Sequence, residues 1–86
     1  MSRNKKLIDR FLIKPKDFTY NELKKLLNGF GYSEISGGKT SGSKVAFYNE
    51  AIQHIIRLHK PHPGIILKKY QLDLIEVELK NKGIIE

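Results

Sequence analysis

The sequence predicts a small α+β domain in which helices cover one face of a three-stranded antiparallel sheet. Up to Gly31 the apolar residues recur every three or four positions, which is typical of amphipathic helices. Between Tyr32 and His59 they alternate with polar residues, which is typical of half-buried strands. The helical spacing returns after Pro63. We therefore expect a two-layer α-α-β-β-β-α sandwich that forms one domain from the 86 residues.

The first predicted helix covers residues 4–13 and ends at Lys14, because Pro15 disfavours helical geometry in the residue before it. The residues of its apolar stripe are Leu7, Ile8, Phe11 and Leu12. A short connector then leads to the second helix.

The second helix has the best local signal in the chain. Thr19 is followed three residues later by Glu22, so each side chain can satisfy a backbone amide of the first turn. Phe18 and Leu23 have the spacing of a hydrophobic staple around this cap. Gly31 allows the left-handed conformation that ends a helix. The expected buried stripe is Leu23, Leu26, Leu27 and Phe30.

Three strands are expected at residues 32–36, 44–48 and 52–59, and a last helix from about residue 67 to residue 82, where Gly83 stops it. If Ile56 and Leu58 point to the core, the outward face of the third strand carries Arg57 and His59. The stripe of the last helix consists of Leu72, Ile75 and Leu79, flanked by Leu67 and Leu74.

Composition limits the classes of function. Sixteen Lys and Arg against nine Asp and Glu give a net charge of +7, which favours a polyanionic partner such as RNA, although solubility alone also accounts for such a charge. The absence of cysteine excludes thiol catalysis, thiolate zinc sites and iron–sulfur clusters, and is compatible with the cytoplasm. No apolar run approaches the roughly 18 residues of a membrane span. We expect a soluble cytoplasmic protein with no membrane partner and no cofactor.

The segment from Gly37 to Ser43 is rich in glycine and hydroxyl residues but lacks the spacing of a nucleotide-binding loop. It joins two strands, so its plain interpretation is a hairpin loop. With lysines beside it, the same loop can contact a nucleic-acid backbone. The candidate RNA-binding residues of this region and of the third strand are Lys39, Ser41, Ser43, Lys44, Arg57 and Lys60.

His59 and His62 lie on either side of Lys60-Pro61. No cysteine exists and no carboxylate lies nearby on this stretch, so we expect no metal site there. Cleavage of RNA through its own 2′-hydroxyl needs a base, an acid and a cation that stabilises the phosphorane, and histidine is the side chain best suited to move protons near neutral pH. Arg57 and Lys60 supply the cations within the same stretch. The alternative is a histidine that only packs or caps a loop.

Several segments in order carry a resemblance to a known family. They are Gly38-Lys39-Thr40-Ser41-Gly42-Ser43, Val45-x-Phe47, and Leu58-His59-Lys60-Pro61-His62-Pro63, with Asp17-Phe18-Thr19-Tyr20-x-Glu22-Leu23 upstream. The chain resembles HicA-type toxins of the longer subgroup, with an additional N-terminal helix at residues 1–14 before a core at residues 15–86. This resemblance implies a double-stranded-RNA-binding-like fold, ribosome-independent cleavage of mRNA as an mRNA interferase, and neutralisation by a HicB-like antitoxin protein in a type II toxin–antitoxin system.

The chain departs from the family at one position. The usual catalytic histidine follows a Gly-Ser pair, whereas Lys44 follows Gly42-Ser43 here. Lysine is a poor general base near neutral pH but can stabilise a phosphorane. Because antiparallel pairing brings the start of the second strand beside the end of the third, we expect His59 next to Lys44. The predicted catalytic set of this metal-independent endoribonuclease is His59, His62 and Lys44.

Two further interpretations stay open. One is a non-catalytic RNA-binding module of the same fold, which the lysine at position 44 favours. The other is a protein-interaction module whose basic face binds only an acidic partner.

Overall fold

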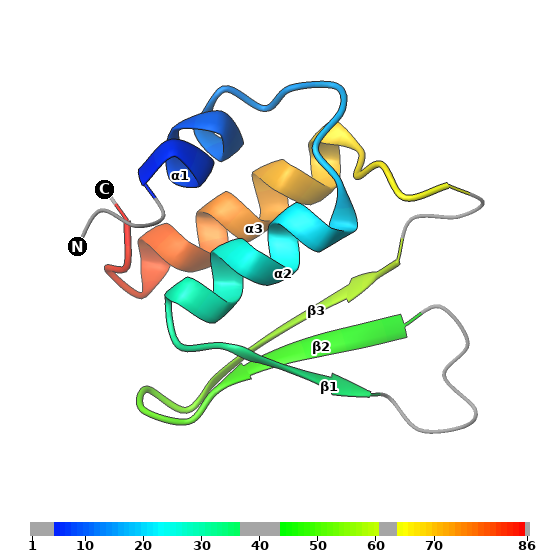
Figure 1. The fold of residues 1–86 in the computed structure, drawn as a ribbon. Helices are drawn as coiled ribbons and strands as arrows, with labels where there is room; N and C mark the ends of the chain where they lie inside the picture. Colours follow the sequence, from blue (N-terminus) through cyan, green and yellow to red (C-terminus); the bar gives the residue numbers. More distant parts are fainter. Residues whose placement is uncertain (1–4, 37–43, 61–63, 86) are drawn as a thin grey trace.

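The computed structural model describes residues 5–36, 44–60 and 64–85. Its elements are α1 (Lys5–Leu12), α2 (Tyr20–Gly29), β1 (Ser33–Ser36), β2 (Lys44–Asn49), β3 (His54–His59) and α3 (Lys69–Asn81). The strands form one antiparallel sheet in the order β1-β2-β3, and all three helices lie on the same side of it (Figure 1). The α+β class and the order of elements are therefore confirmed.

The hydrophobic core lies between the helices and the sheet. Each of the three helices and both long strands contribute to it, and Phe11 of α1 packs edge-on against Phe18 with ring centroids 5.8 Å apart. The buried apolar residues are Phe11, Phe18, Leu23, Leu26, Leu27, Tyr32, Val45, Phe47, Ile56, Leu58, Leu67, Leu72, Ile75 and Leu79. Of the predicted stripe residues, Leu12 and Leu74 are 40% and 47% exposed, and Leu7, Ile8 and Phe30 are only partly buried against the core.

The predicted capping box at the start of α2 is confirmed. Thr19 Oγ1 accepts a hydrogen bond from the Glu22 amide at 3.1 Å, and Glu22 Oε1 accepts one from the Thr19 amide at 2.9 Å. Arg10 Nε donates to Glu22 Oε2 at 2.7 Å, and this bond holds the pKa of the Glu22 carboxyl below its ordinary value. The ion pair also ties α1 to the start of α2.

The turn after α2 depends on glycine. Gly31 has a φ of +99°, which glycine adopts without steric cost. A Cβ at this position would lie 3.1 Å from Asn49 Nδ2, which donates to the Phe30 carbonyl at 3.0 Å. At this turn the backbone passes close to Asn49, the last residue of β2, and a side chain at position 31 would crowd Asn49.

Two elements begin two residues later than the sequence predicts, and the other boundaries agree to within one or two residues. The third strand begins at His54 and not at Ile52, because residues 50–53 form the turn between the paired residues Asn49 and His54, and Gln53 has a left-handed φ of +51°. The last helix begins at Lys69 and not at Leu67. The Leu67 amide donates to the Phe18 carbonyl at 2.8 Å, outside the helix, and Lys68 is the extended N-cap that precedes it.

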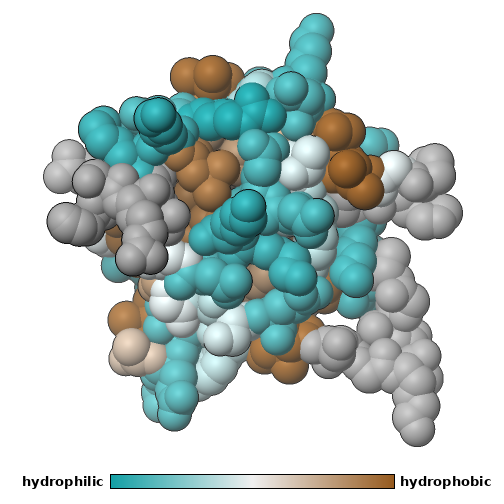
Figure 2. Space-filling model, in the orientation of Figure 1, coloured by the Kyte–Doolittle hydropathy of each residue, from teal (hydrophilic) through white to brown (hydrophobic). Residues whose placement is uncertain are grey.

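Figure 2 shows a mainly hydrophilic face in which apolar patches are separate from one another. In the part of the chain that the structure describes, no helix has the length and apolar character needed to cross a bilayer.

Candidate functional site

The strand register places the predicted site residues of β2 and β3 beside one another. Lys44 pairs with His59, and Ala46 pairs with Arg57. The prediction that Lys44 and His59 lie next to each other is therefore confirmed. Ser36 of β1 pairs with Val45, so all three strands meet near this end of the sheet.

The sheet has one covered face and one uncovered face. The strand residues that point toward the helices are buried, among them Phe47 and Ile56. The alternate residues point away from the helices and form what we call the outer face (Figure 1). It consists of Ser33, Ile35, Lys44, Ala46, Tyr48, Ile55, Arg57 and His59. Lys44, Arg57 and His59 are exposed, so the polar groups of the outer face are open to a ligand.

The two cations of the outer face lack carboxylate partners, whereas several cations of the helical layer have them. Lys14 pairs with Asp73 and Glu76, and Lys80 pairs with Glu76. The side chains of Lys44 and Arg57 make no hydrogen bond or ion pair with any residue in the described ranges. No strand residue of the outer face is acidic, so this face carries uncompensated positive charge.

Lys60 follows His59 but turns to the other side of the sheet. Its Nζ lies 5.5 Å from the centroid of the Tyr20 ring in α2. The Tyr20 hydroxyl donates to Glu34 Oε2 at 2.7 Å, and this bond lowers the pKa of the Glu34 carboxyl. Burial, with Glu34 nearby, raises the pKa of Tyr20. Arg57 and Lys60, which lie in the same stretch of sequence, therefore point to opposite sides of the sheet.

Four of the predicted site residues lie outside the described residues. They are Lys39, Ser41, Ser43 and His62. The part of the predicted site that the structure does describe is Lys44, Arg57, His59 and Lys60.

Sequence reasoning missed Gln71, which supports the backbone of His59. Gln71 lies in the first turn of α3, and its side-chain Nε2 donates to the His59 carbonyl at 2.8 Å. The side chain is 5% exposed, and its Oε1 accepts from the Lys68 amide at 3.0 Å. The only signal for this role was an uncharged polar residue beside the apolar stripe of α3. Gln71 thus anchors the end of β3 to the helical layer.

The other histidine of β3, His54, has a structural environment. The Tyr32 hydroxyl lies 2.6 Å from His54 Nδ1, and Glu78 Oε1 lies 2.8 Å from His54 Nε2. Because a carboxylate only accepts, Nε2 donates to Glu78, and in a neutral ring the Tyr32 hydroxyl then donates to Nδ1. Burial, with Glu78 nearby, raises the pKa of Tyr32. His54 connects β3, the start of β1 and α3 inside the fold.

Within residues 5–36, 44–60 and 64–85 no group of three or more His, Asp or Glu side chains is arranged to hold a metal ion. Comparison of the chain with protein-family models, with curated proteins and with solved structures gives no match. The candidate functional site of this chain is therefore defined by the residues of the outer face alone.

Proposed function

We propose that this protein is an RNA-cleaving toxin of the HicA type, with a double-stranded-RNA-binding-like fold and its site at the Lys44 end of the outer face. The observation that carries the proposal is the pairing of Lys44 with His59, with Arg57 in the next outward position of β3. Cleavage of a phosphodiester through the 2′-hydroxyl needs a base, an acid and cationic stabilisation, and this exposed surface supplies one proton-transfer group and two cations.

In the proposed reaction the 2′-oxygen of RNA attacks the adjacent phosphorus. The P–O2′ bond forms and the P–O5′ bond breaks, which leaves a 2′,3′-cyclic phosphate on one product and a 5′-hydroxyl on the other. His59 takes the proton from the 2′-hydroxyl, and His62 is the second histidine, which gives a proton to the departing 5′-oxygen. Lys44 and Arg57 stabilise the additional negative charge of the phosphorane. No metal and no other reactant is needed for this balance.

The regulatory partner in this proposal is an acidic, HicB-like antitoxin that covers the Lys44 end of the outer face. Charge complementarity would steer such a partner to the uncompensated cations. An antitoxin that abolishes toxicity and yet leaves Arg57 and His59 accessible would contradict this part of the proposal.

The second candidate is a non-catalytic RNA-binding module. It is favoured by Lys44 itself, because the resemblance places the catalytic histidine of the family at this position. In that case the outer face binds RNA and leaves it intact.

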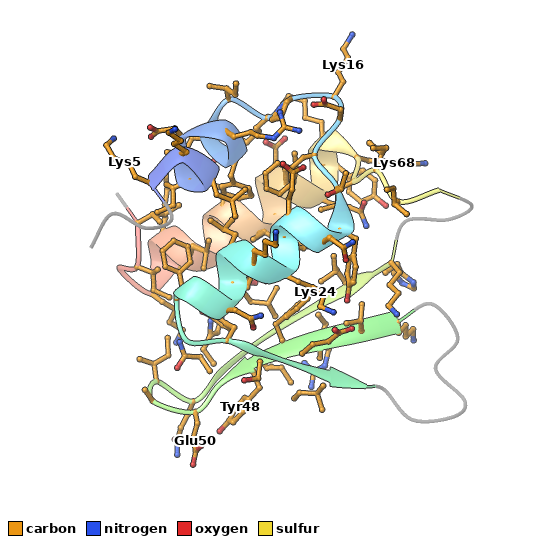
Figure 3. The ribbon with its side chains drawn as sticks, in the orientation of Figure 1. Lys5, Lys16, Lys24, Tyr48, Glu50 and Lys68 are labelled. Atoms are coloured by element: carbon orange, nitrogen blue, oxygen red, sulfur yellow. The ribbon has the colours of Figure 1, made fainter. Side chains whose placement is uncertain are left out.

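We expect His59→Ala to lower the rate of RNA cleavage by about 10²- to 10⁴-fold, the usual contribution of one proton-transfer group. The measurement is single-turnover cleavage of an unstructured RNA oligonucleotide by the purified protein, with growth arrest on induced expression as the cellular readout. Lys16→Ala is the matched control, because Lys16 is exposed and projects from the loop between α1 and α2, far from the outer face (Figure 3).

Each outcome separates the two candidates. Cleavage by the parent that is lost in His59→Ala and kept in Lys16→Ala supports the toxin. Full cleavage by a His59→Ala, His62→Ala double variant would overturn the proposed mechanism. A parent protein that binds RNA without cleaving it, and that gains cleavage on Lys44→His, would instead identify the module as a binder that lacks its histidine.

A further inference from the structure

The outer face continues beyond the proposed cleavage site. Lateral neighbours across the three strands form three rows on it. The first row is Lys44 and His59, the second is Ile35, Ala46 and Arg57, and the third is Ser33, Tyr48 and Ile55. Cations thus occupy the first two rows, and an aromatic ring occupies the third.

Tyr48 is the only aromatic residue of the outer face. Its side chain points away from the helical layer (Figure 3) and is half-buried. Unlike Tyr20 and Tyr32, it makes no hydrogen bond or ring contact with a residue of the described segments. Its neighbour in β1, Ser33, is small, and no helix covers this face. The ring is therefore available to a flat ligand.

The spacing of the rows suits a nucleic-acid strand. Residues four apart on a strand lie about 14 Å from each other at ~3.4 Å per residue, so this is the separation of Lys44 and Tyr48 along β2. Arg57 lies in the row between them. An RNA strand that runs along β2 would place its phosphates near Lys44 and Arg57, and a base further along the RNA would reach Tyr48.

We propose that the outer face binds single-stranded RNA, with an unpaired base stacked on Tyr48 and the neighbouring phosphates bound by Arg57 and Lys44. This inference deepens the proposed function and rests on it, because it assigns a base-binding subsite to the same surface. Tyr48 acts in binding and orientation and takes no part in proton transfer.

The chemistry of the face selects single-stranded RNA over a duplex. The bases of a duplex are paired and stacked on each other, and proteins recognise it by shape and by contacts to phosphates and 2′-hydroxyls. An exposed aromatic ring on a sheet adds nothing to such recognition, whereas stacking on aromatic side chains is the usual way in which unpaired bases are held.

Apart from the acidic antitoxin proposed for its Lys44 end, this face matches a polyanion better than an ordinary protein partner. The centres of protein interfaces are depleted in charged residues. Here Arg57 occupies the middle row, and its charge is not balanced by any described residue. A polyanion supplies the missing charge along with the flat groups that stack on Tyr48.

The test measures binding separately from cleavage. In a His59→Ala background, fluorescence anisotropy follows an unstructured RNA oligonucleotide, the same oligonucleotide annealed to its complement, and a version in which internal bases are replaced by abasic sites. Tyr48→Ala and Tyr48→Phe are compared with the matched control Tyr70→Ala, since Tyr70 is 66% exposed and lies on α3, away from the sheet. A 2-aminopurine base in the oligonucleotide reports stacking directly through quenching.

We expect Tyr48→Ala to weaken single-strand binding by roughly 5- to 150-fold, the range that corresponds to the loss of one stacked base. Tyr48→Phe and Tyr70→Ala should stay within about twofold of the background protein. The background protein should bind the abasic oligonucleotide more weakly than the intact one by a similar factor. Tyr48→Ala should not weaken binding of the abasic oligonucleotide any further. The loss of affinity for the abasic oligonucleotide is measured without a substitution at position 48, so the base contribution can be tested even if Tyr48→Ala fails to fold.

Two results would overturn the inference and leave the proposed function standing. One is single-strand binding that is the same for Tyr48→Ala and the background protein. The other is tighter binding of the duplex than of the single strand. Loss of a protein partner, but not of RNA, on Tyr48→Ala would assign the face to a protein and reject the base-binding subsite. If neither RNA form binds at all, the proposed function fails and the inference fails with it.

Discussion

β3 carries a histidine at each end, and the two side chains have opposite environments. His54 points to the helical layer, is 8% exposed, and is held between Tyr32 and Glu78. His59 lies five positions later, so it points to the outer face, where it is exposed and paired with Lys44. The histidine at one end of the strand thus belongs to the interior of the fold, and the histidine at the other end lies on the exposed surface. Because side chains alternate along a strand, residues five positions apart point to opposite faces of the sheet.

The comparison extends to the two faces of the sheet. The covered face holds the residues whose burial stabilises the fold, whereas the outer face holds cations and one aromatic ring without contributing to the core. Substitutions on the covered face should therefore change the free energy of unfolding, and substitutions on the outer face should change RNA binding and cleavage.

The largest effect on stability is expected for Phe47→Ala. Phe47 is fully buried at the centre of β2 and lies 6.1 Å from the Tyr20 ring. Its truncation should lower the free energy of unfolding by about 3–5 kcal/mol, because the lost burial and the cavity both count. Urea unfolding followed by circular dichroism measures this change. Arg57→Ala on the outer face should stay within about 0.5 kcal/mol, and an equal loss for both variants would refute the division of the two faces.

A smaller loss of stability is expected for His54→Ala. The variant leaves the buried Tyr32 hydroxyl without its partner, and an unsatisfied buried polar group costs about 1–3 kcal/mol. His59→Ala should be neutral to folding. In a double-mutant cycle, Tyr32→Phe should cost less in the His54→Ala background than in the parent, since the orphaned hydroxyl is then removed. Strict additivity in that cycle would show that the hydrogen bond contributes nothing.

The smallest effect is expected in the salt dependence of RNA binding. If Arg57 contacts one phosphate of a single strand, Arg57→Ala should make the slope of log affinity against log salt shallower by about 0.7. Titrations of the same oligonucleotide at several salt concentrations give this slope, and Lys16→Ala should leave it unchanged. A slope that does not differ between Arg57→Ala and the parent would place the phosphate contacts elsewhere.

The elements of the fold were largely predictable from local patterns. The capping box at Thr19 and Glu22, the stop at Gly31 and the outward position of Arg57 each depend on residues within a few positions of one another. Boundaries were less predictable. The sequence around Ile52 is compatible with an alternating strand and also with a turn. Only the pairing of Asn49 with His54 places Ile52 in the turn.

The contacts of the site were less predictable than its location. Alternation placed His59 on the outer face, and strand order placed it beside Lys44. The direction of Lys60 depends on the ring of Tyr20, which is distant in sequence. The bond from Gln71 to the His59 carbonyl likewise spans 12 positions, and no local pattern reports a donor that far away.

The sequence by itself therefore determined which residues of each strand share a face, because side chains alternate along a strand with a period of two whatever surrounds it. It also determined the positive charge of the chain, since that depends on composition alone. Only the tertiary structure decided which face the helices cover and which cations are neutralised. It also decided that His54 is enclosed by Tyr32 and Glu78, 22 and 24 positions away. The physical reason is that helix packing and ion pairing join residues through space, and their partners are selected by the shape of the folded chain and not by their distance along it.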